Sequence, residues 1–147
     1  MRGVIDTHLV ILLKRLSPDL TPDEPLITAI TLAELSIGPL ATEDDHERAA
    51  RQAHLQEAEA IFEPLPFDAA AARAYGRVAA SLRRSGRKPQ ARAFDALIAA
   101  TAMSRGLGVW TCNPKDFEGV DGLTVVAVPH PGDEALTPGS GAAPDGR

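Results

Sequence analysis

Apolar residues in this chain fall into short continuous runs and into longer stretches where they recur every three or four positions. Short runs are typical of buried strands, whereas the longer spacing places apolar side chains on one face of a helix. The predicted strands are residues 4–5, 26–30, 61–65, 109–111 and 123–128. The predicted helices are residues 9–16, 31–37, 42–60, 68–85 and 94–105. This alternation predicts an α/β fold with a mainly parallel sheet of about five strands and helices on both faces.

The predicted elements form one domain. A length of 147 residues suits a single hydrophobic core, and residues 1–129 contain every predicted helix and strand without a repeat. Residues 130–147 are rich in Gly, Pro and Ala and lack the large apolar side chains that order a segment. We expect this tail to be disordered or to act as a docking extension.

The sequence suits a reducing compartment. Its single cysteine, Cys112, excludes an internal disulfide framework, and the first residues enter a strand without the regions of a signal peptide. No apolar run approaches the roughly 20 residues that span a bilayer. We therefore expect a soluble, cytoplasmic protein that does not enter membranes.

Charge is unevenly distributed along the chain. The formal net charge of −5 argues against a surface built wholly for non-specific nucleic-acid binding. Seven basic residues nevertheless gather in one stretch: Arg73, Arg77, Arg83, Arg84, Arg87, Lys88 and Arg92. They form either a solvated helix face and polar loop, or a strip that guides a polyanion.

Four acidic residues stand in or beside apolar segments, where a charge is costly unless it is neutralised. They are Asp6, Glu34, Asp95 and Asp116. Asp6 and Asp116 follow predicted strands, and ligands of open α/β sheets bind outside the carboxyl ends of the strands. Two carboxylates about 4 Å apart repel by roughly 4 kcal/mol at an effective dielectric near 20, and a divalent ion removes that cost. A shared cation site is therefore the leading hypothesis.

Each acid also has an ordinary structural explanation. Asp6 can cap the helix that follows it, and Thr31 with Glu34 satisfies the pattern of a capping box. Asp116 suits a turn. Capping explains Asp95 less well, because Arg92 and Ala93 precede it and the apolar run begins at Phe94. Asp95 also shares a helix face with apolar residues of its own segment. Asp95 is therefore the strongest functional candidate of the four.

The donor types indicate which metal such a site would bind. Carboxylate oxygens favour Mg²⁺ or Mn²⁺ over Zn²⁺. The four histidines show no spacing that builds a zinc site: His8, His46, His54 and His130. His8 stands near Asp6, and it either faces the same pocket or is an ordinary packed or surface histidine.

Together, four motifs resemble the PIN-domain ribonucleases, and most closely the VapC-type toxins of toxin–antitoxin pairs. The resemblance spans about residues 4–128, and its most specific part is the run that begins at Asp95. The motifs are Val4-Ile5-Asp6-Thr7, Thr31-Leu32-Ala33-Glu34-Leu35 with Gly38, Asp95-Ala96-Leu97-Ile98-Ala99-Ala100-Thr101-Ala102, and Thr111-Cys112-Asn113 followed by Asp116-Phe117.

The resemblance implies a three-layer α/β/α sandwich in which the four acids bind one or two Mg²⁺ or Mn²⁺ ions. It also implies endonucleolytic cleavage of RNA, homodimerisation, and inhibition by a small VapB-like antitoxin whose tail wraps the toxin. Thr7, Thr111 and Asn113 match positions that support the acids or water by hydrogen bonds. Cys112 stands where such toxins commonly carry a basic residue, so a possible phosphate contact is missing.

The mechanistic hypothesis is attack on an RNA phosphodiester by metal-activated water. Asp6, Asp95 and Asp116 hold the metal, while Glu34 either ligates it or orients the water. Arg87, Lys88 and Arg92 are the candidate substrate contacts.

Other classes of function fit less well. A PIN-like module that binds RNA or a partner without cutting it should have a degraded acidic set, and here all four acids are present. A phosphotransferase with Asp6 as its nucleophile predicts a second Asp at the position of His8. Phosphate-binding loops, nucleophile elbows and dinucleotide fingerprints are missing from the sequence. DNA remains an alternative substrate, because phosphate contacts carry little information about the sugar.

Overall fold

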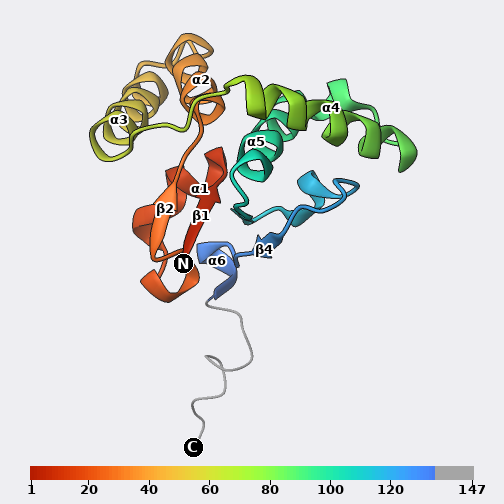
Figure 1. Cartoon of the computed structure of the whole chain (residues 1–147). Helices are drawn as coiled ribbons and strands as arrows, with labels where there is room; N and C mark the ends of the chain where they lie inside the picture. Colours follow the sequence, from red (N-terminus) through yellow and green to blue (C-terminus); the bar gives the residue numbers. More distant parts are fainter. Residues whose placement is uncertain (135–147) are drawn as a thin grey trace, which may run out of the picture.

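The computed structural model describes residues 1–134 (Figure 1). Residues Pro131–Glu134 form a short helix, α6, so the first residues of the predicted tail are helical. The rest of that tail, residues 135–147, lies outside the described residues. None of the helices within residues 1–134 is long and apolar enough to cross a membrane.

Four parallel strands form the sheet, in the order β2-β1-β3-β4. They are β1 (Arg2–Ile5), β2 (Glu24–Leu26), β3 (Val109–Thr111) and β4 (Val125–Ala127). Val4 of β1 pairs with Leu26 on one side and with Val109 on the other. Strands from the two ends of the described chain therefore meet at the centre of the sheet.

Helices cover both faces of the sheet. The longer ones are α1 (Thr7–Leu12), α2 (Ala29–Ile37), α3 (Asp45–Ile61), α4 (Ala69–Arg84) and α5 (Ala93–Ser104). Successive strand residues point to opposite faces. Ile5 packs in one core with Leu9 of α1, whereas Val4 packs in a second core with Ile98 of α5. The predicted α/β architecture with helices on both faces is confirmed.

Among these helices, α2 and α3 lie together at one end of the molecule, while α4 runs alongside α5 (Figure 1). The interface of α4 with α5 has its own small core, which includes Val78 and Ala100. As expected for a segment that is apolar nearly all round, the middle of α5 is deeply buried, although Phe94 in its first turn is 41% exposed.

The strand predicted at residues 61–65 is reduced to one bridge. Ile61 ends α3, and the Phe62 N–H still donates to Ala58 in the helical pattern. Only Leu65 pairs in a strand-like manner, through a bridge to Thr28. Pro64 and Pro66 flank Leu65, and proline has no N–H to donate to a ladder. The prediction of an extended strand was wrong, and Ile61 is 62% exposed.

Candidate active site

Two of the four predicted acids follow strands, and the other two stand on helices that contact each other. Asp6 comes directly after β1, and Asp116 lies in the 3₁₀ helix η5 (Pro114–Phe117) after β3. Glu34 is on α2 and Asp95 is on α5, and these two helices are in contact. The four carboxyl groups are close enough for their charges to interact, since Asp116, Glu34 and Asp6 all raise the pKa of Asp95.

Asp6 has both a capping contact and a contact that crosses the sheet. Its Oδ1 accepts a 3.0 Å hydrogen bond from the Leu9 N–H and caps α1. Its Oδ2 accepts a 2.5 Å hydrogen bond from the hydroxyl of Thr111, at the end of the neighbouring strand β3. Burial raises the pKa of Asp6, and the two hydrogen bonds and the charge of His8 oppose that rise. The structural and functional explanations of Asp6 are thus compatible.

Glu34 is not part of a capping box, which corrects the alternative offered by the sequence. Helix α2 begins earlier than predicted, at Ala29, because Thr28 has extended backbone and its side chain caps the Thr31 N–H at 3.2 Å. Glu34 therefore lies within the helix, and its carboxylate accepts a hydrogen bond from the Thr7 hydroxyl. Burial raises the pKa of Glu34, as does the charge of Asp6.

Asp95 is the least compensated of the four acids. It lies in the first turn of α5, on the side that packs with Ile98 and Ala99 onto the sheet. Within the described part of the chain its carboxylate receives no hydrogen bond and forms no ion pair. Burial, followed by the charges of Asp116, Glu34 and Asp6, raises the pKa of Asp95 to about 7.

Asp116, by contrast, already has a cationic partner. The Arg92 guanidinium donates from Nη1 to Asp116 Oδ1. Arg92 ends the 3₁₀ helix η4 (Pro89–Arg92), three residues before Asp95. The sequence suggested Arg92 only as a substrate contact. The Arg-x-x-Asp spacing places Arg92 about one turn before Asp95, but it carries no information on the pair with Asp116.

The three predicted supporting residues have different contacts. Thr7 and Thr111 donate directly to carboxylates, those of Glu34 and Asp6 respectively. Asn113 acts one step further away, because its backbone N–H donates to Thr111 Oγ1 at 2.9 Å while its side chain is exposed. These hydrogen bonds fix the orientation of Asp6 through β3 and of Glu34 through α1.

The donor set fits a hard divalent cation in chemistry and charge, because it consists of carboxylates whose negative charge is only partly neutralised. However, these carboxylates do not surround a common point. Among residues 1–134, no three His, Cys, Asp or Glu side chains converge as a metal site would require. Arg92 holds Asp116, and Thr7 holds Glu34. Binding a cation therefore requires side chains to rotate toward it.

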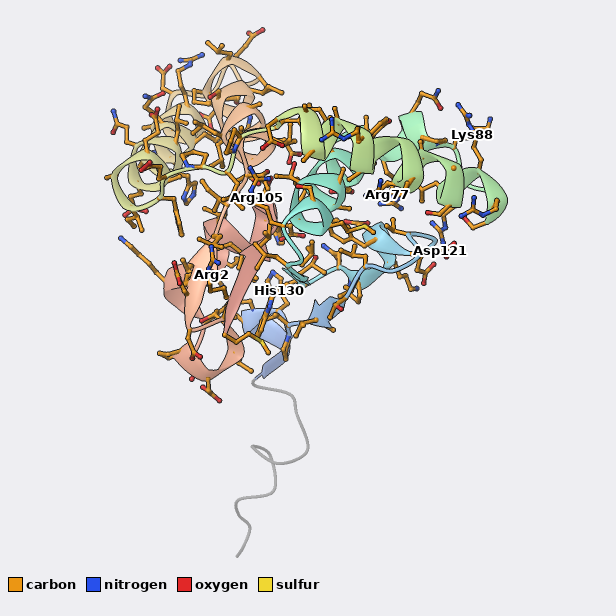
Figure 2. The ribbon with its side chains drawn as sticks, viewed as in Figure 1. Arg2, Arg77, Lys88, Arg105, Asp121 and His130 are labelled. Carbon is orange, nitrogen blue, oxygen red and sulfur yellow. The ribbon has the colours of Figure 1, made fainter. Side chains whose placement is uncertain are left out.

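Three of the seven residues of the predicted basic strip are paired with acids. Arg84 contacts Asp121 at 3.1 Å, Arg87 pairs with Glu118, and Arg92 pairs with Asp116. The other members form no ion pair within the described residues: Arg73, Arg77, Arg83 and Lys88. A pocket of about 200 Å³ is lined by Leu82, Arg87, Lys88, Arg92 and Glu118. Lys88 lies near the end of α4, and Asp121 lies on the loop below that helix (Figure 2).

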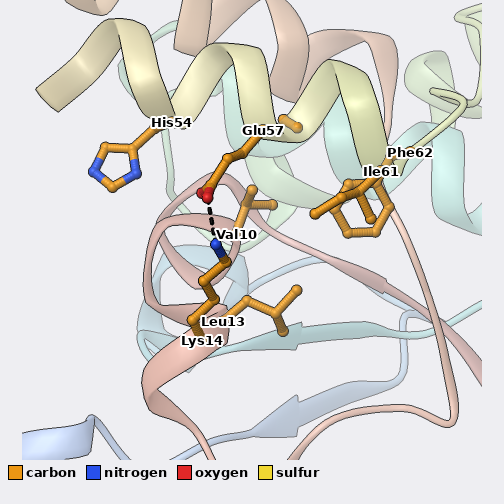
Figure 3. Close-up of a pocket in the computed structure, with 8 residues that line it drawn as sticks. Val10, Leu13, Lys14, His54, Glu57, Ile61 and Phe62 are labelled. Atoms are coloured by element: carbon orange, nitrogen blue, oxygen red, sulfur yellow. Dashed lines mark hydrogen bonds and ion pairs between the residues drawn. The ribbon is translucent and has the colours of Figure 1, made fainter. Parts of the chain in front are cut away.

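A second hollow, between α1 and α3, contains none of the four acids (Figure 3). Its volume is about 30 Å³, roughly the space of one water molecule. Val10 and Phe62 are among the apolar side chains that line it, and Lys14 and Glu57 form an ion pair there. We interpret this hollow as a small packing defect in the contact that holds α3 against α1.

Similarity to known proteins extends over most of the chain. The PIN domain family matches residues 4–123. Ribonuclease VapC5 of Mycobacterium tuberculosis is 41% identical over 129 residues, which cover 86% of this chain and 93% of that protein. The tRNA(fMet)-specific endonuclease VapC of Shigella flexneri is 32% identical over 130 residues, which cover 84% of this chain and 95% of that protein.

Solved structures show the same likeness. The crystal structure of VapBC-5, a toxin–antitoxin system from Mycobacterium tuberculosis, matches with a TM-score of 0.75 and 39% identity, covering 86% of this chain and 98% of that one. DNA-bound VapBC from Salmonella typhimurium matches with a TM-score of 0.66 and 28% identity, covering 86% and 98% respectively. The chain therefore belongs to the PIN-domain family and, within it, to the VapC ribonucleases of toxin–antitoxin systems.

Proposed function

We propose that this VapC ribonuclease is a divalent-metal-dependent endoribonuclease whose metal, Mg²⁺ or Mn²⁺, is held by Asp6, Glu34, Asp95 and Asp116. PIN-domain nucleases are in general metal-dependent. The observation that carries the assignment is Asp95: a half-buried carboxylate without a hydrogen bond or ion pair among the described residues, beside three more carboxylates. A site with this much uncompensated negative charge is stabilised by a cation.

The side chains of the site have different roles in the proposed reaction. A bound divalent ion supplies a water of lowered pKa and stabilises negative charge on the phosphate oxygens. Asp6 and Asp95 hold the ion with Asp116, and the Thr111 hydroxyl keeps Asp6 in its orientation. Glu34, aligned by Thr7, either ligates the ion or orients the attacking water. The raised pKa of Glu34 suits it to accept a proton from that water.

RNA is the proposed substrate. The relatives include proteins named ribonucleases and a tRNA(fMet)-specific endonuclease. Arg87, Lys88 and Arg92 line the pocket between η4 and η5, and we expect them to contact backbone phosphates. Phosphate contacts do not exclude DNA, so a comparison of RNA and DNA oligonucleotides of the same sequence belongs to the basic assay.

We propose a VapB-like antitoxin as the protein partner, because the structural relatives are toxin–antitoxin complexes. Homodimerisation of the toxin remains a prediction of the sequence resemblance. Light scattering on the free toxin and on the toxin with its antitoxin measures both states.

The decisive test of the enzyme is Asp95→Asn. We expect Mg²⁺-dependent RNA cleavage to fall at least about 100-fold, since even outer-shell partners of metal ligands contribute 10- to 100-fold. Asp121→Asn, which changes an exposed acid outside the quartet, is the matched control and should retain activity. Circular dichroism checks that both variants stay folded. Full activity of a folded Asp95→Asn protein would contradict the assignment.

The alternative is a PIN-like module that binds RNA or a partner without cutting it. The retention of all four acids argues against it. This alternative predicts that the wild-type protein retains RNA in the presence of Mg²⁺ without producing new RNA ends, and end-sequencing of the incubated RNA distinguishes the two functions.

A further inference from the structure

Three ion pairs link two segments that flank the proposed site. Arg84, Arg87 and Arg92 come from residues 84–92, and their partners come from residues 116–121. The basic partners are three of the seven residues of the predicted phosphate-binding strip. In the free protein this part of the strip is therefore neutralised by acids of its own chain.

The three pairs differ in their relation to the quartet. The outermost pair joins two strongly exposed side chains, with 65% of Arg84 and 76% of Asp121 accessible. The innermost pair, Arg92 with Asp116, is less exposed, at 44% and 30%. Its acid belongs to the proposed metal site, and the positive charge of Arg92 also acts on Asp95. Only this pair involves a candidate metal ligand.

We propose that Arg92 is a built-in counter-cation of the acidic quartet, which a divalent ion releases from Asp116 and which then binds an RNA phosphate. The inference rests on the proposed function. It gives the Arg92 guanidinium two successive partners, first Asp116 and then an RNA phosphate. Arg92 is thus a residue that links metal occupancy to substrate binding.

The exchange follows from competition for one carboxylate. Arg92 binds Asp116 through Oδ1, so a metal that takes this carboxylate weakens or displaces the ion pair. The released side chain already lines the 200 Å³ pocket that it shares with Arg87 and Lys88. A guanidinium binds phosphate well because its planar fork can donate two parallel hydrogen bonds.

The backbone around the ion pairs favours rotation of the side chain over separation of the two segments. Gly119 has a φ of +89°, and a Cβ added there would lie 2.6 Å from Ser85 Oγ. Residues 84–92 and 116–121 are therefore packed in direct contact. Arg92 has room to move because nearly half of its side chain is exposed.

The first test measures metal binding without RNA. Mn²⁺ affinity is measured by calorimetry and by electron paramagnetic resonance for the wild type, Arg92→Gln and the matched control Arg84→Gln. We expect Arg92→Gln to bind Mn²⁺ about 3- to 5-fold more tightly, which corresponds to the upper part of the range for loss of one exposed ion pair. Arg84→Gln should stay within twofold of the wild type, because its partner Asp121 lies outside the quartet.

The second test measures binding of a phosphorothioate RNA oligonucleotide that resists cleavage. With Mn²⁺ present, Arg92→Gln should bind this RNA about 3- to 10-fold more weakly, and the slope of log K against log salt should shrink by about 0.7, the value for one phosphate contact on a single strand. In EDTA the same substitution should change RNA affinity less than twofold, because Arg92 is then held by Asp116. Arg92→Lys keeps the charge but loses the fork, so it should retain near wild-type Mn²⁺ affinity and still bind RNA more weakly.

The outcomes separate the two proposals. A wild-type protein that binds no Mn²⁺ and cuts no RNA overturns the proposed function. A wild type that binds Mn²⁺ and cuts RNA, with Arg92→Gln and Arg84→Gln binding Mn²⁺ equally, overturns the role of Arg92 and leaves the enzyme assignment intact. RNA binding that Arg92→Gln weakens equally with and without metal also contradicts the exchange.

Discussion

The carboxyl groups of this protein fall into two populations. On the surface, Glu57 pairs with Lys14, which lowers the pKa of Glu57 through a hydrogen bond and through its charge. Asp68 accepts the Ala71 N–H at the start of α4, and this hydrogen bond lowers the pKa of Asp68. At the candidate site the direction is reversed, since burial raises the pKa values of Asp6, Glu34 and Asp95.

The difference follows from where the acids stand, because the residue types are the same. Exposed side chains such as Glu57 rotate until they meet a cation or an N–H group. Asp6 and Asp95 are held by a strand end and by the first turn of a buried helix, where the fold brings acids together and provides few cations. The fold thus concentrates unfavourable charge in one place, which is the physical requirement for a cation site.

Among substitutions that keep all four acids, Thr111→Val should affect the site most strongly, because it removes the hydroxyl that orients Asp6 and leaves the shape of the side chain nearly unchanged. We expect a 10- to 100-fold loss of RNA cleavage and a loss of stability of about 1–3 kcal/mol. Thr101→Val is the matched control, since Thr101 is equally buried but its hydroxyl donates to Leu97 O within α5 and touches none of the four acids. Equal losses of activity in the two variants would show that Thr111 has no special role.

Divalent metal should stabilise the protein through the site acids and not through the surface acids. At a Mn²⁺ concentration 100 times its Kd, the free energy of unfolding should rise by about 2.7 kcal/mol. Asp95→Asn should lose most of this gain, whereas Asp121→Asn should keep it. Urea unfolding with Mn²⁺ and with EDTA measures the difference, and an undiminished gain in Asp95→Asn would exclude Asp95 as a ligand.

The metal-free protein should become less stable between about pH 4 and pH 7. The pKa of Asp95 is about 7 in the folded protein against a usual value of 3.8, so in this range the folded state retains a proton that the unfolded state releases. Because Asp95 is half-exposed, we expect its contribution to be about 1–2 kcal/mol after solvent screening. Asp95→Asn should remove that part of the pH dependence, as measured by urea unfolding in EDTA. A pH profile identical to that of the wild type would contradict the raised pKa.

The surface pair of Lys14 with Glu57 should have the smallest effect on stability. Its dependence on pH should have the opposite sign to that of Asp95. The pKa of Glu57 is lowered in the folded state, so its stabilising contribution is present above the pKa of the unfolded chain and is lost as pH falls. Lys14→Met should change Tm by less than about 3 °C, and added salt should reduce that change. A larger shift that salt does not affect would mean that the contact between α1 and α3 depends on this pair.

The sequence predicted the layers and the positions of the four acids, because strand ends and apolar helix faces leave a periodic signal. It did not predict the number of strands, since Pro64 and Pro66 limit Leu65 to one bridge despite its apolar surroundings. It also misplaced the start of α2 at Thr31, because the apolar run at residues 26–30 was assigned to a strand, whereas Thr28 caps the helix. The pairing of Arg92 with Asp116 joins segments 24 residues apart, and local patterns carry no information on such contacts.

Because β1 pairs with β3, the candidate active site can be completed only late in the synthesis of the chain. Asp6 and the Thr111 hydroxyl that holds it lie near opposite ends of the folded domain, and Asp116 is later still. A ribosome-bound chain therefore lacks a complete set of acids until almost the whole domain has emerged. A shift of β1 by one residue would also turn its side chains to the opposite faces of the sheet. Truncated or misaligned copies of this toxin should thus be harmless to the cell that makes them.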